Sequence, residues 1–119
     1  PVCEDDSFEP NDEPEYAGEV ELNKTYGNLM LCKYNVDWYK FEVEANTLIT
    51  ITIEFDTENT DLDLRLYKSS NLVQPFLKGV ENEGYEIIEC YVDSDETFYI
   101  RVSGFAGSQA PYTLTLSSE

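Results

Sequence analysis

Residues 48–55 read Leu-Ile-Thr-Ile-Thr-Ile-Glu-Phe, and apolar and polar side chains alternate through the whole stretch. Successive side chains of a β-strand point to opposite faces. The alternation therefore predicts a strand that buries Ile49, Ile51, Ile53 and Phe55 on one face. The other face would carry threonine and glutamate side chains into water, so this strand would have one buried and one solvent-exposed face.

The same period of two returns on both sides of this stretch. It predicts strands at 38–43, 62–67, 98–102 and 112–116, with turn-forming residues between them. Two further strands are expected at Tyr26–Cys32 and Tyr85–Val92. Short strands with one apolar face each cannot form a single open sheet in water, so two sheets must stack. The predicted fold class is all-β: an antiparallel β-sandwich of jelly-roll type with 7–8 strands.

The length and charge of the chain limit what it can bind. Its 119 residues predict a single domain over 1–119, with an acidic arm at 1–21 and the sandwich at 22–119. There are 25 acidic and 7 basic residues, which give a formal net charge of −18. Such a charge repels nucleic acids and anionic membranes, so neither is expected as a partner. No apolar run is long enough to span a membrane.

The acidic residues are concentrated at the amino end. Nine of them precede Leu22, and no Lys or Arg does. Two interpretations remain open: a solvated acidic arm, or a set of carboxylates held together by a divalent cation. Prolines and turn formers at residues 9–14 make the segment loop-like, with a short helical turn around Glu13–Gly18.

The three cysteines match no metal-binding or redox spacing. One disulfide and one free thiol is the simplest account, and three pairings are possible. Cys90 lies in an apolar segment, where an inert thiol is typical, whereas Cys3 and Cys32 flank the acidic arm. The Cys3–Cys32 pairing is therefore favoured, and it would indicate an oxidising compartment, outside the cell or at its surface.

Enzyme chemistry has little support in this sequence. The chain has no histidine, the commonest general base, and no glycine-rich phosphate loop. Two carboxylates would suffice for a glycosidase, but among 25 acidic residues a pair at any spacing is expected by chance. The chain is predicted not to be an enzyme.

Hard-cation binding is the chemistry that remains. Residues 7–12 supply Ser, Glu, Asn and Asp oxygens, the ligand types that calcium prefers. A second cluster, Asn35-Val36-Asp37, comes just before a strand. If the arm packs beside it, both clusters can close on one ion. The EF-hand pattern is absent, and on spacing alone a plain turn explains residues 7–12 equally well.

Five motifs in order resemble those of the bacterial pre-peptidase C-terminal domain, over a span from Asp6 to Leu116. In chain order they are Asp6–Asp12 with Ala17, Asn35–Phe41, Thr60–Tyr67, Phe98–Gly104 and Tyr112–Leu114. The resemblance implies a β-sandwich module appended to secreted enzymes, often peptidases. The similar collagen-binding domains of clostridial collagenases hold calcium between an N-terminal arm and the sandwich.

Carried onto this chain, the resemblance implies a structural Ca²⁺ site. Two positions depart from the pattern: Asn35 replaces a usual Asp, and Ser7 replaces an acid of the collagen binders, for which Asp6 would substitute. Both departures would weaken calcium binding without abolishing it. The implied metal ligands are Asp6, Glu9, Asn11, Asp12, Asn35 and Asp37.

Two features of the strands have both a functional and a structural interpretation. Asp61 and Asp63 would form a second cation site or fix a loop, or they would accept backbone hydrogen bonds and discourage edge pairing. Alternation also places five aromatic and Arg side chains outward, as binding residues or as ordinary cross-strand packers. These five are Trp38, Arg65, Tyr67, Tyr99 and Arg101.

The favoured function is a non-catalytic accessory module, secreted or at the cell surface, with a calcium-stabilised arm. Its partner would be a parent secreted enzyme or surface protein in the same chain. The alternative is a binding module for an extracellular protein fibre or a polysaccharide, through the outward aromatic and Arg residues.

Overall fold

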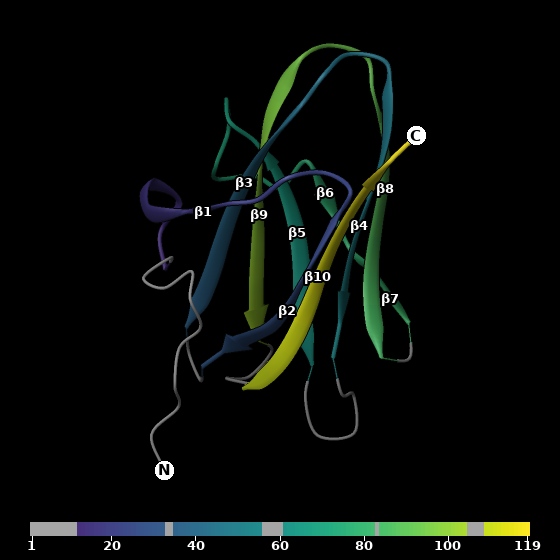
Figure 1. Cartoon of the computed structure of the whole chain (residues 1–119). Coiled ribbons are helices and arrows are strands. Elements are labelled where there is room, and N and C mark those ends of the chain that lie inside the picture. Colours follow the sequence, from purple (N-terminus) through teal and green to yellow (C-terminus); the bar gives the residue numbers. More distant parts are fainter. Residues whose placement is uncertain (1–11, 33–34, 56–60, 83, 105–108) are drawn as a thin grey trace.

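The computed structural model describes residues 12–32, 35–55, 61–82, 84–104 and 109–119, and these form two stacked β-sheets (Figure 1). A single turn of 3-10 helix, η1, comes first. Strands longer than six residues supply most of both sheets, and β1, β6 and β7 are short. The elements are η1 Pro14–Tyr16, β1 Gly18–Glu19, β2 Lys24–Leu31, β3 Val36–Val43, β4 Thr47–Glu54, β5 Leu62–Lys68, β6 Leu77–Lys78, β7 Val80–Asn82, β8 Tyr85–Val92, β9 Glu96–Gly104 and β10 Ala110–Ser118.

The strand order is β1-β3-β9-β5-β6 in one sheet, here called sheet A, and β2-β10-β4-β8-β7 in the other, sheet B. All pairings are antiparallel except that of β1 with β3. The seven longer strands coincide with the seven predicted segments, so the predicted sandwich of jelly-roll type is confirmed.

The core lies between the sheets and is built by alternation. Ile49, Ile51 and Ile53 are 0% exposed and Phe55 is 8% exposed, as predicted for that stretch. Phe98 stacks on Phe41, with ring centroids 5.8 Å apart. Aliphatic and aromatic side chains from both sheets thus exclude water from the interior, which is the main source of stability.

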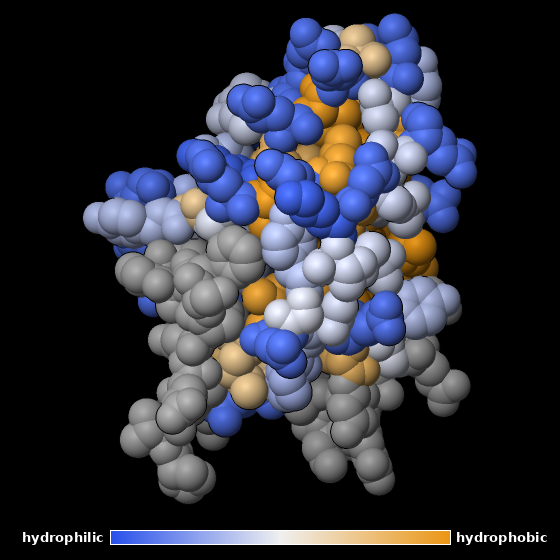
Figure 2. All heavy atoms as spheres, viewed as in Figure 1, coloured by the Kyte–Doolittle hydropathy of each residue, from blue (hydrophilic) through white to orange (hydrophobic). Residues whose placement is uncertain are grey.

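The outer face of sheet B is polar by comparison. Figure 2 shows the side of the molecule on which β2 and β10 lie, where apolar residues show mainly between hydrophilic ones. Thr50 and Thr52 of β4 are half-buried and alternate with the buried isoleucines, as the sequence predicts. In the described part of the chain, no helix is long and apolar enough to cross a membrane.

The segment predicted as an acidic arm includes both η1 and β1. The predicted helical turn is present as η1. Strand β1 then pairs with the edge of β3, with Gly18 opposite Tyr39 and Glu19 opposite Lys40. The N–H of Val20 extends this pairing by donating to the carbonyl of Lys40 over 3.0 Å. Because the pairing is parallel, the residues before β1 lead back along β3 toward its first residues.

Candidate functional site

Asp37 is a fully buried carboxylate near the start of β3, 0% exposed. It lies on the same strand face as Tyr39, and both side chains enter the space between the sheets. The hydroxyl of Tyr112, from β10, donates to Oδ2 of Asp37 over 2.6 Å. The hydroxyls of Tyr39 and Tyr112 are 2.5 Å apart. Since the single hydroxyl hydrogen of Tyr112 is donated in the bond to Asp37, Tyr39 must donate to Tyr112, and a hydrogen-bonded chain joins the two sheets.

Burial of Tyr112, with Tyr39 and the Asp37 carboxylate beside it, raises the pKa of this phenol well above its ordinary value. Its hydroxyl therefore remains a hydrogen-bond donor at all physiological pH values. A permanent donor stabilises a buried carboxylate, which would otherwise lose its hydration without compensation. Sequence reasoning missed Tyr112 as a partner of Asp37, although the alternation in β3 already places Asp37 on the core face.

The other predicted calcium ligands lie around the start of β3 or in the arm. Asn35 is half-buried directly before β3, and its N–H donates to the carbonyl of Cys32 over 3.0 Å. Asp12 is exposed just before η1. Asp6, Glu9 and Asn11 lie outside the described residues. Asp12, Asn35 and Asp37 can supply only oxygen ligands through their side chains, which fits a hard cation such as Ca²⁺.

The predicted disulfide concerns the same region. Cys32 is buried one residue after β2. Among the described cysteines, Cys90 carries a free thiol and Cys32 does not. Burial raises the pKa of the Cys90 thiol, an effect that Lys68 partly opposes, and this disfavours the reactive thiolate at neutral pH. Cys3 lies outside the described residues, and its pairing with Cys32 stays a prediction.

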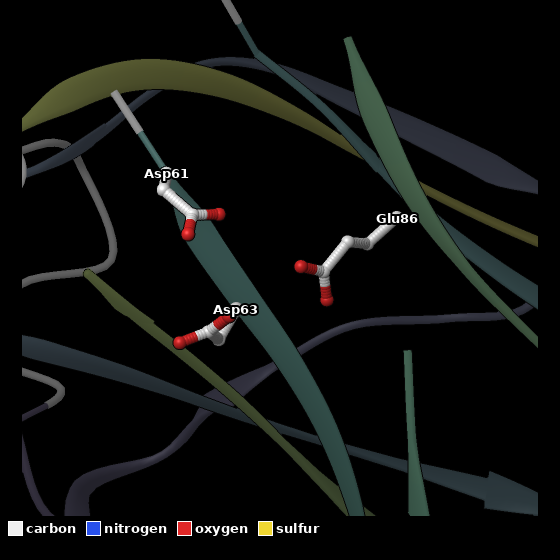
Figure 3. A group of neighbouring side chains, drawn as sticks. All are labelled: Asp61, Asp63 and Glu86. Atoms are coloured by element: carbon white, nitrogen blue, oxygen red, sulfur yellow. The ribbon is translucent and has the colours of Figure 1, made fainter. Parts of the chain in front are cut away.

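A second acidic group lies at the edge of sheet A, where Asp61 and Asp63 meet Glu86 (Figure 3). Asp63 belongs to β5, Asp61 directly precedes that strand, and Glu86 reaches across from β8. One carboxylate oxygen from each lies within 4.8 Å of the others. Carboxylates this close repel one another unless they share a proton or a cation.

Glu86 is the member of this group that the sequence analysis missed. It is 3% exposed, and its Oε1 accepts the N–H of Leu64 over 2.9 Å. The carboxylate thereby acts as a hydrogen-bond partner for the edge of β5. A signal was present in the sequence, because Glu86 has the same alternation phase as the buried Ile88 and Val92.

The acidic group predicts a pH-dependent stability. Burial, and the neighbouring charge of Asp61, raise the pKa of Asp63 above its ordinary 3.8, although Arg65 and Arg101 partly counter this. The folded state then binds this proton more tightly than the unfolded state does. The resulting stabilisation is complete below 3.8 and is lost as the pH rises through the higher folded-state value.

We therefore expect Asp63→Asn to be more stable than the original protein at pH 7 by a few degrees in Tm, with the gap closing in acid. Thermal unfolding in EDTA between pH 3 and 8 measures this difference in Tm. Asp61→Asn is the companion variant. Removal of the Asp61 charge relieves the repulsion on the Asp63 carboxylate, so this variant too should be more stable at pH 7. A gap that stays constant over this pH range would contradict the prediction.

The five predicted binding residues lie on one outer face, that of sheet A. Trp38 is paired with Arg101, and Arg101 with Arg65, across three adjacent strands. Tyr99 and Tyr67 are paired in the neighbouring row. Trp38 and Tyr67, however, are only 7% and 4% exposed. Their rings pack against each other with centroids 5.1 Å apart, so neither ring is a freely exposed binding residue.

Comparisons with known proteins agree with this architecture. A family model described as the bacterial pre-peptidase C-terminal domain matches residues 35–104. The pre-peptidase C-terminal domain of a collagenase from Bacillus anthracis has 20% identity and a TM-score of 0.70, with 89% of this chain and 99% of that chain covered. No curated protein matches the sequence.

Two lysozyme inhibitors have the same fold. PliG of Aeromonas hydrophila, a periplasmic inhibitor of g-type lysozyme, has 13% identity and a TM-score of 0.65, covering 87% of this chain and 97% of its own. PliG of Salmonella Typhimurium has 10% identity and a TM-score of 0.53, covering 87% and 99%. At these identities the likeness concerns the fold alone.

Proposed function

Because the chain belongs to the bacterial pre-peptidase C-terminal domain family, we propose that it is a non-catalytic accessory module of a secreted enzyme or surface protein, with an N-terminal arm held by Ca²⁺. Domains of this family are accessory modules of secreted bacterial proteases. The proposal further places this chain outside the cell and the Cys3–Cys32 disulfide beside the calcium site.

The single observation that carries the calcium proposal is the parallel pairing of β1 with β3. An antiparallel pairing would lead the acidic arm away from Asp37. The parallel register instead aims the chain before Gly18 at the start of β3, where Asn35 and Asp37 lie. An arm that continues in this direction would bring its acidic oxygens to those of the sandwich, and a divalent cation would offset their mutual repulsion.

Thermal unfolding with and without calcium tests the proposal. Extracellular calcium modules have dissociation constants of roughly 10⁻⁴–10⁻³ M, so 10 mM Ca²⁺ would stabilise the folded state by about 1.4–2.7 kcal/mol. For a domain of this size that is a rise in Tm of roughly 5–10 °C over EDTA. Asp37→Asn keeps the side-chain shape and an oxygen acceptor for Tyr112 but removes the charge, and we expect it to abolish most of the rise.

Two control variants locate the effect. Asp93→Asn removes one exposed carboxylate after β8, and the full calcium response is expected. Asp61→Asn removes a member of the second acidic group, and here too the response is expected to persist. The proposal fails if Ca²⁺ leaves Tm unchanged, or if Asp61→Asn and not Asp37→Asn abolishes the shift.

A second candidate function is the binding of an extracellular polymer through the outer face of sheet A. The specific observation in its favour is the register, which gathers Trp38, Arg65, Tyr67, Tyr99 and Arg101 on one face. Arg and aromatic side chains are the types that dominate binding energy at interfaces. The two functions are compatible, since an accessory module can hold its parent enzyme on a substrate surface.

A further inference from the structure

One asparagine of the chain has the sequence context of an N-glycosylation acceptor. Residues 21–25 read Glu-Leu-Asn-Lys-Thr, so Asn23 is followed two residues later by Thr25, and the residue between them is not proline. None of the other seven asparagines has Ser or Thr at this spacing. Glu21 adds an acidic side chain two residues before Asn23, a feature that bacterial oligosaccharyltransferases select in their acceptors. The context therefore points to Asn23 alone.

The acceptor lies at the surface, where an enzyme can reach it. Asn23 is in the turn between β1 and β2, and Asn23, Lys24 and Thr25 are all exposed. Asn23 has a φ of 65°, so the backbone leaves the extended conformation there. Among the described strands β2 is the outermost of sheet B, and its first residues pair with β10 on one side only. An exposed turn in an exported protein is where such acceptors are modified.

The side-chain contacts of this segment with the rest of the fold come from the last strand of the chain. The Asn23 carboxamide donates from Nδ2 to Oγ of Ser118 and accepts the N–H of Ser118 at Oδ1, both over 2.9 Å. Oγ1 of Thr25 accepts the hydroxyl of Thr115 over 3.3 Å. These bonds can form only after β10 has been made and has paired with β2. Until then, the acceptor amide is not held by the fold.

We infer that Asn23 is an N-glycosylation site, modified by an oligosaccharyltransferase during export, before β10 pairs with β2. The inference goes beyond the proposed function and shares with it only the export of the chain. In the reaction, Nδ2 of Asn23 bonds to the anomeric carbon of a polyprenyl-diphosphate-linked oligosaccharide. The bond between that carbon and the diphosphate oxygen breaks, and polyprenyl diphosphate leaves with the bonding electrons. Nδ2 loses one proton to a base, and nothing is oxidised or reduced.

A glycan at Asn23 is compatible with the fold and with the proposed calcium site. Only one hydrogen of Nδ2 is replaced, and Oδ1 can still accept the N–H of Ser118. Strand β2 has eight residues and leads from the acceptor to Cys32, whose carbonyl accepts the N–H of Asn35 just before β3 (Figure 1). Eight extended residues span about 26 Å. The sugar would therefore begin at the opposite end of β2 from Asp37.

The test exports the full chain, behind a cleavable leader, in a bacterium supplied with a single-subunit oligosaccharyltransferase and its lipid-linked oligosaccharide. Mass spectrometry is applied only to leader-processed chain, so poor export is not mistaken for lack of transfer. We expect a mass gain of one oligosaccharide on the peptide that carries Asn23. Asn23→Asp and Thr25→Val, which keep the side-chain shapes, should lose this gain, whereas Thr25→Ser should keep it. Asn28→Asp, at another exposed asparagine with positive φ, is the matched control and should be modified normally.

The opposite results are equally clear. Processed chain without a mass gain overturns the inference, as does a gain on another residue or one that survives Thr25→Val. Because transfer is expected before folding, a variant that folds poorly can still be modified, and its loss of the gain is not a folding effect. The calcium response of the unmodified chain is measured separately, so this inference and the proposed function fail independently.

A second measurement tests the order of modification and folding. The purified, folded chain is incubated with the same enzyme and oligosaccharide donor. Ser118→Ala removes the oxygen that accepts the Nδ2 hydrogen bond, so we expect this variant to be modified faster than the original protein. Equal rates for the two proteins would overturn the inferred order and leave Asn23 as the acceptor.

Discussion

Gly79→Ala is expected to lower the free energy of unfolding by about 2–4 kcal/mol and Tm by roughly 10 °C. Gly79 is the single residue between β6 of sheet A and β7 of sheet B, so the chain crosses from one sheet to the other there. A Cβ at this position would lie 2.6 Å from Oε1 of Glu86 and 3.1 Å from the Cβ atoms of Glu86 and Leu64. Such contacts require the Glu86 side chain to move.

Movement of Glu86 is costly because its side chain completes the ladder of β5. Strand β6 pairs with β5 only at Arg65 and Leu66. The backbone groups of Leu64 find partners outside this pairing. Its N–H donates to Oε1 of Glu86, and its carbonyl accepts the N–H of Gly79 over 2.7 Å. If Glu86 were displaced, the buried N–H of Leu64 would lose its acceptor. This would lower the free energy of unfolding by about 1–3 kcal/mol.

A double-mutant cycle isolates this mechanism. Glu86→Ala alone is expected to cost about 2–3 kcal/mol, because Leu64 loses its acceptor. In the Glu86→Ala background the closest contact of the new Cβ is gone, so Gly79→Ala should cost less than about 1 kcal/mol. The coupling energy between the two substitutions should therefore be at least about 1 kcal/mol. Denaturant unfolding of the four proteins in EDTA provides the values.

The matched control is Gly27→Ala in β2, where an added Cβ has no atom within 4 Å. Its effect should stay within about 0.5 kcal/mol. If Gly79→Ala and Glu86→Ala proved additive, the crowding at Gly79 would not act through the Glu86 carboxylate.

The sequence could predict the sandwich because its signal is repeated in every strand. Each long strand has an apolar face, and one pattern of period two suffices to orient it. Trp38 shows the limit of that pattern. Alternation correctly puts it on the outer face of sheet A, but Trp38 is only 7% exposed and packs against Tyr67, which lies on another strand. Contacts of this kind depend on strand order, which is a property of the whole fold.

The candidate site was predictable only in part for the same reason. Asp37 has a local signal, because it precedes Tyr39 by two residues on a core face. Its hydrogen-bond partner Tyr112 is 75 residues away and comes from the other sheet. The parallel pairing of β1 has no periodic signal either, since β1 spans only Gly18–Glu19. Contacts of this kind need three-dimensional information.

Asp37→Ala is the second substitution expected to have a large effect. It should lower the free energy of unfolding in EDTA by about 2–4 kcal/mol. The carboxylate is 0% exposed and accepts a hydrogen bond from the Tyr112 hydroxyl over 2.6 Å, a charge-assisted bond of the strong class. Its removal leaves a small cavity and deprives a buried hydroxyl of its acceptor. Asp37→Asn keeps a carbonyl acceptor in the same place, so about 1 kcal/mol is expected there.

Tyr112→Phe provides the reciprocal test of this interaction. It removes one oxygen and no packing, and we expect the free energy of unfolding to fall by about 1–3 kcal/mol because Asp37 loses the hydrogen bond from Tyr112. The double variant Asp37→Ala/Tyr112→Phe removes both partners, so its loss should be smaller than the sum of the two single losses. Additive losses would mean that the chain of hydroxyls from Tyr39 to Asp37 does not join the sheets energetically.

Repeating the Asp37→Ala measurement in 10 mM Ca²⁺ separates the two roles of this residue. If Asp37 is only a core acceptor, its replacement costs the same with and without calcium. If it also binds the ion, calcium stabilises the original protein but not the variant. The cost of Asp37→Ala is then larger in calcium than in EDTA by the full stabilisation, about 1.4–2.7 kcal/mol. An equal loss in both buffers would remove Asp37 from the ligand set, while the measured coupling to Tyr112 would still stand.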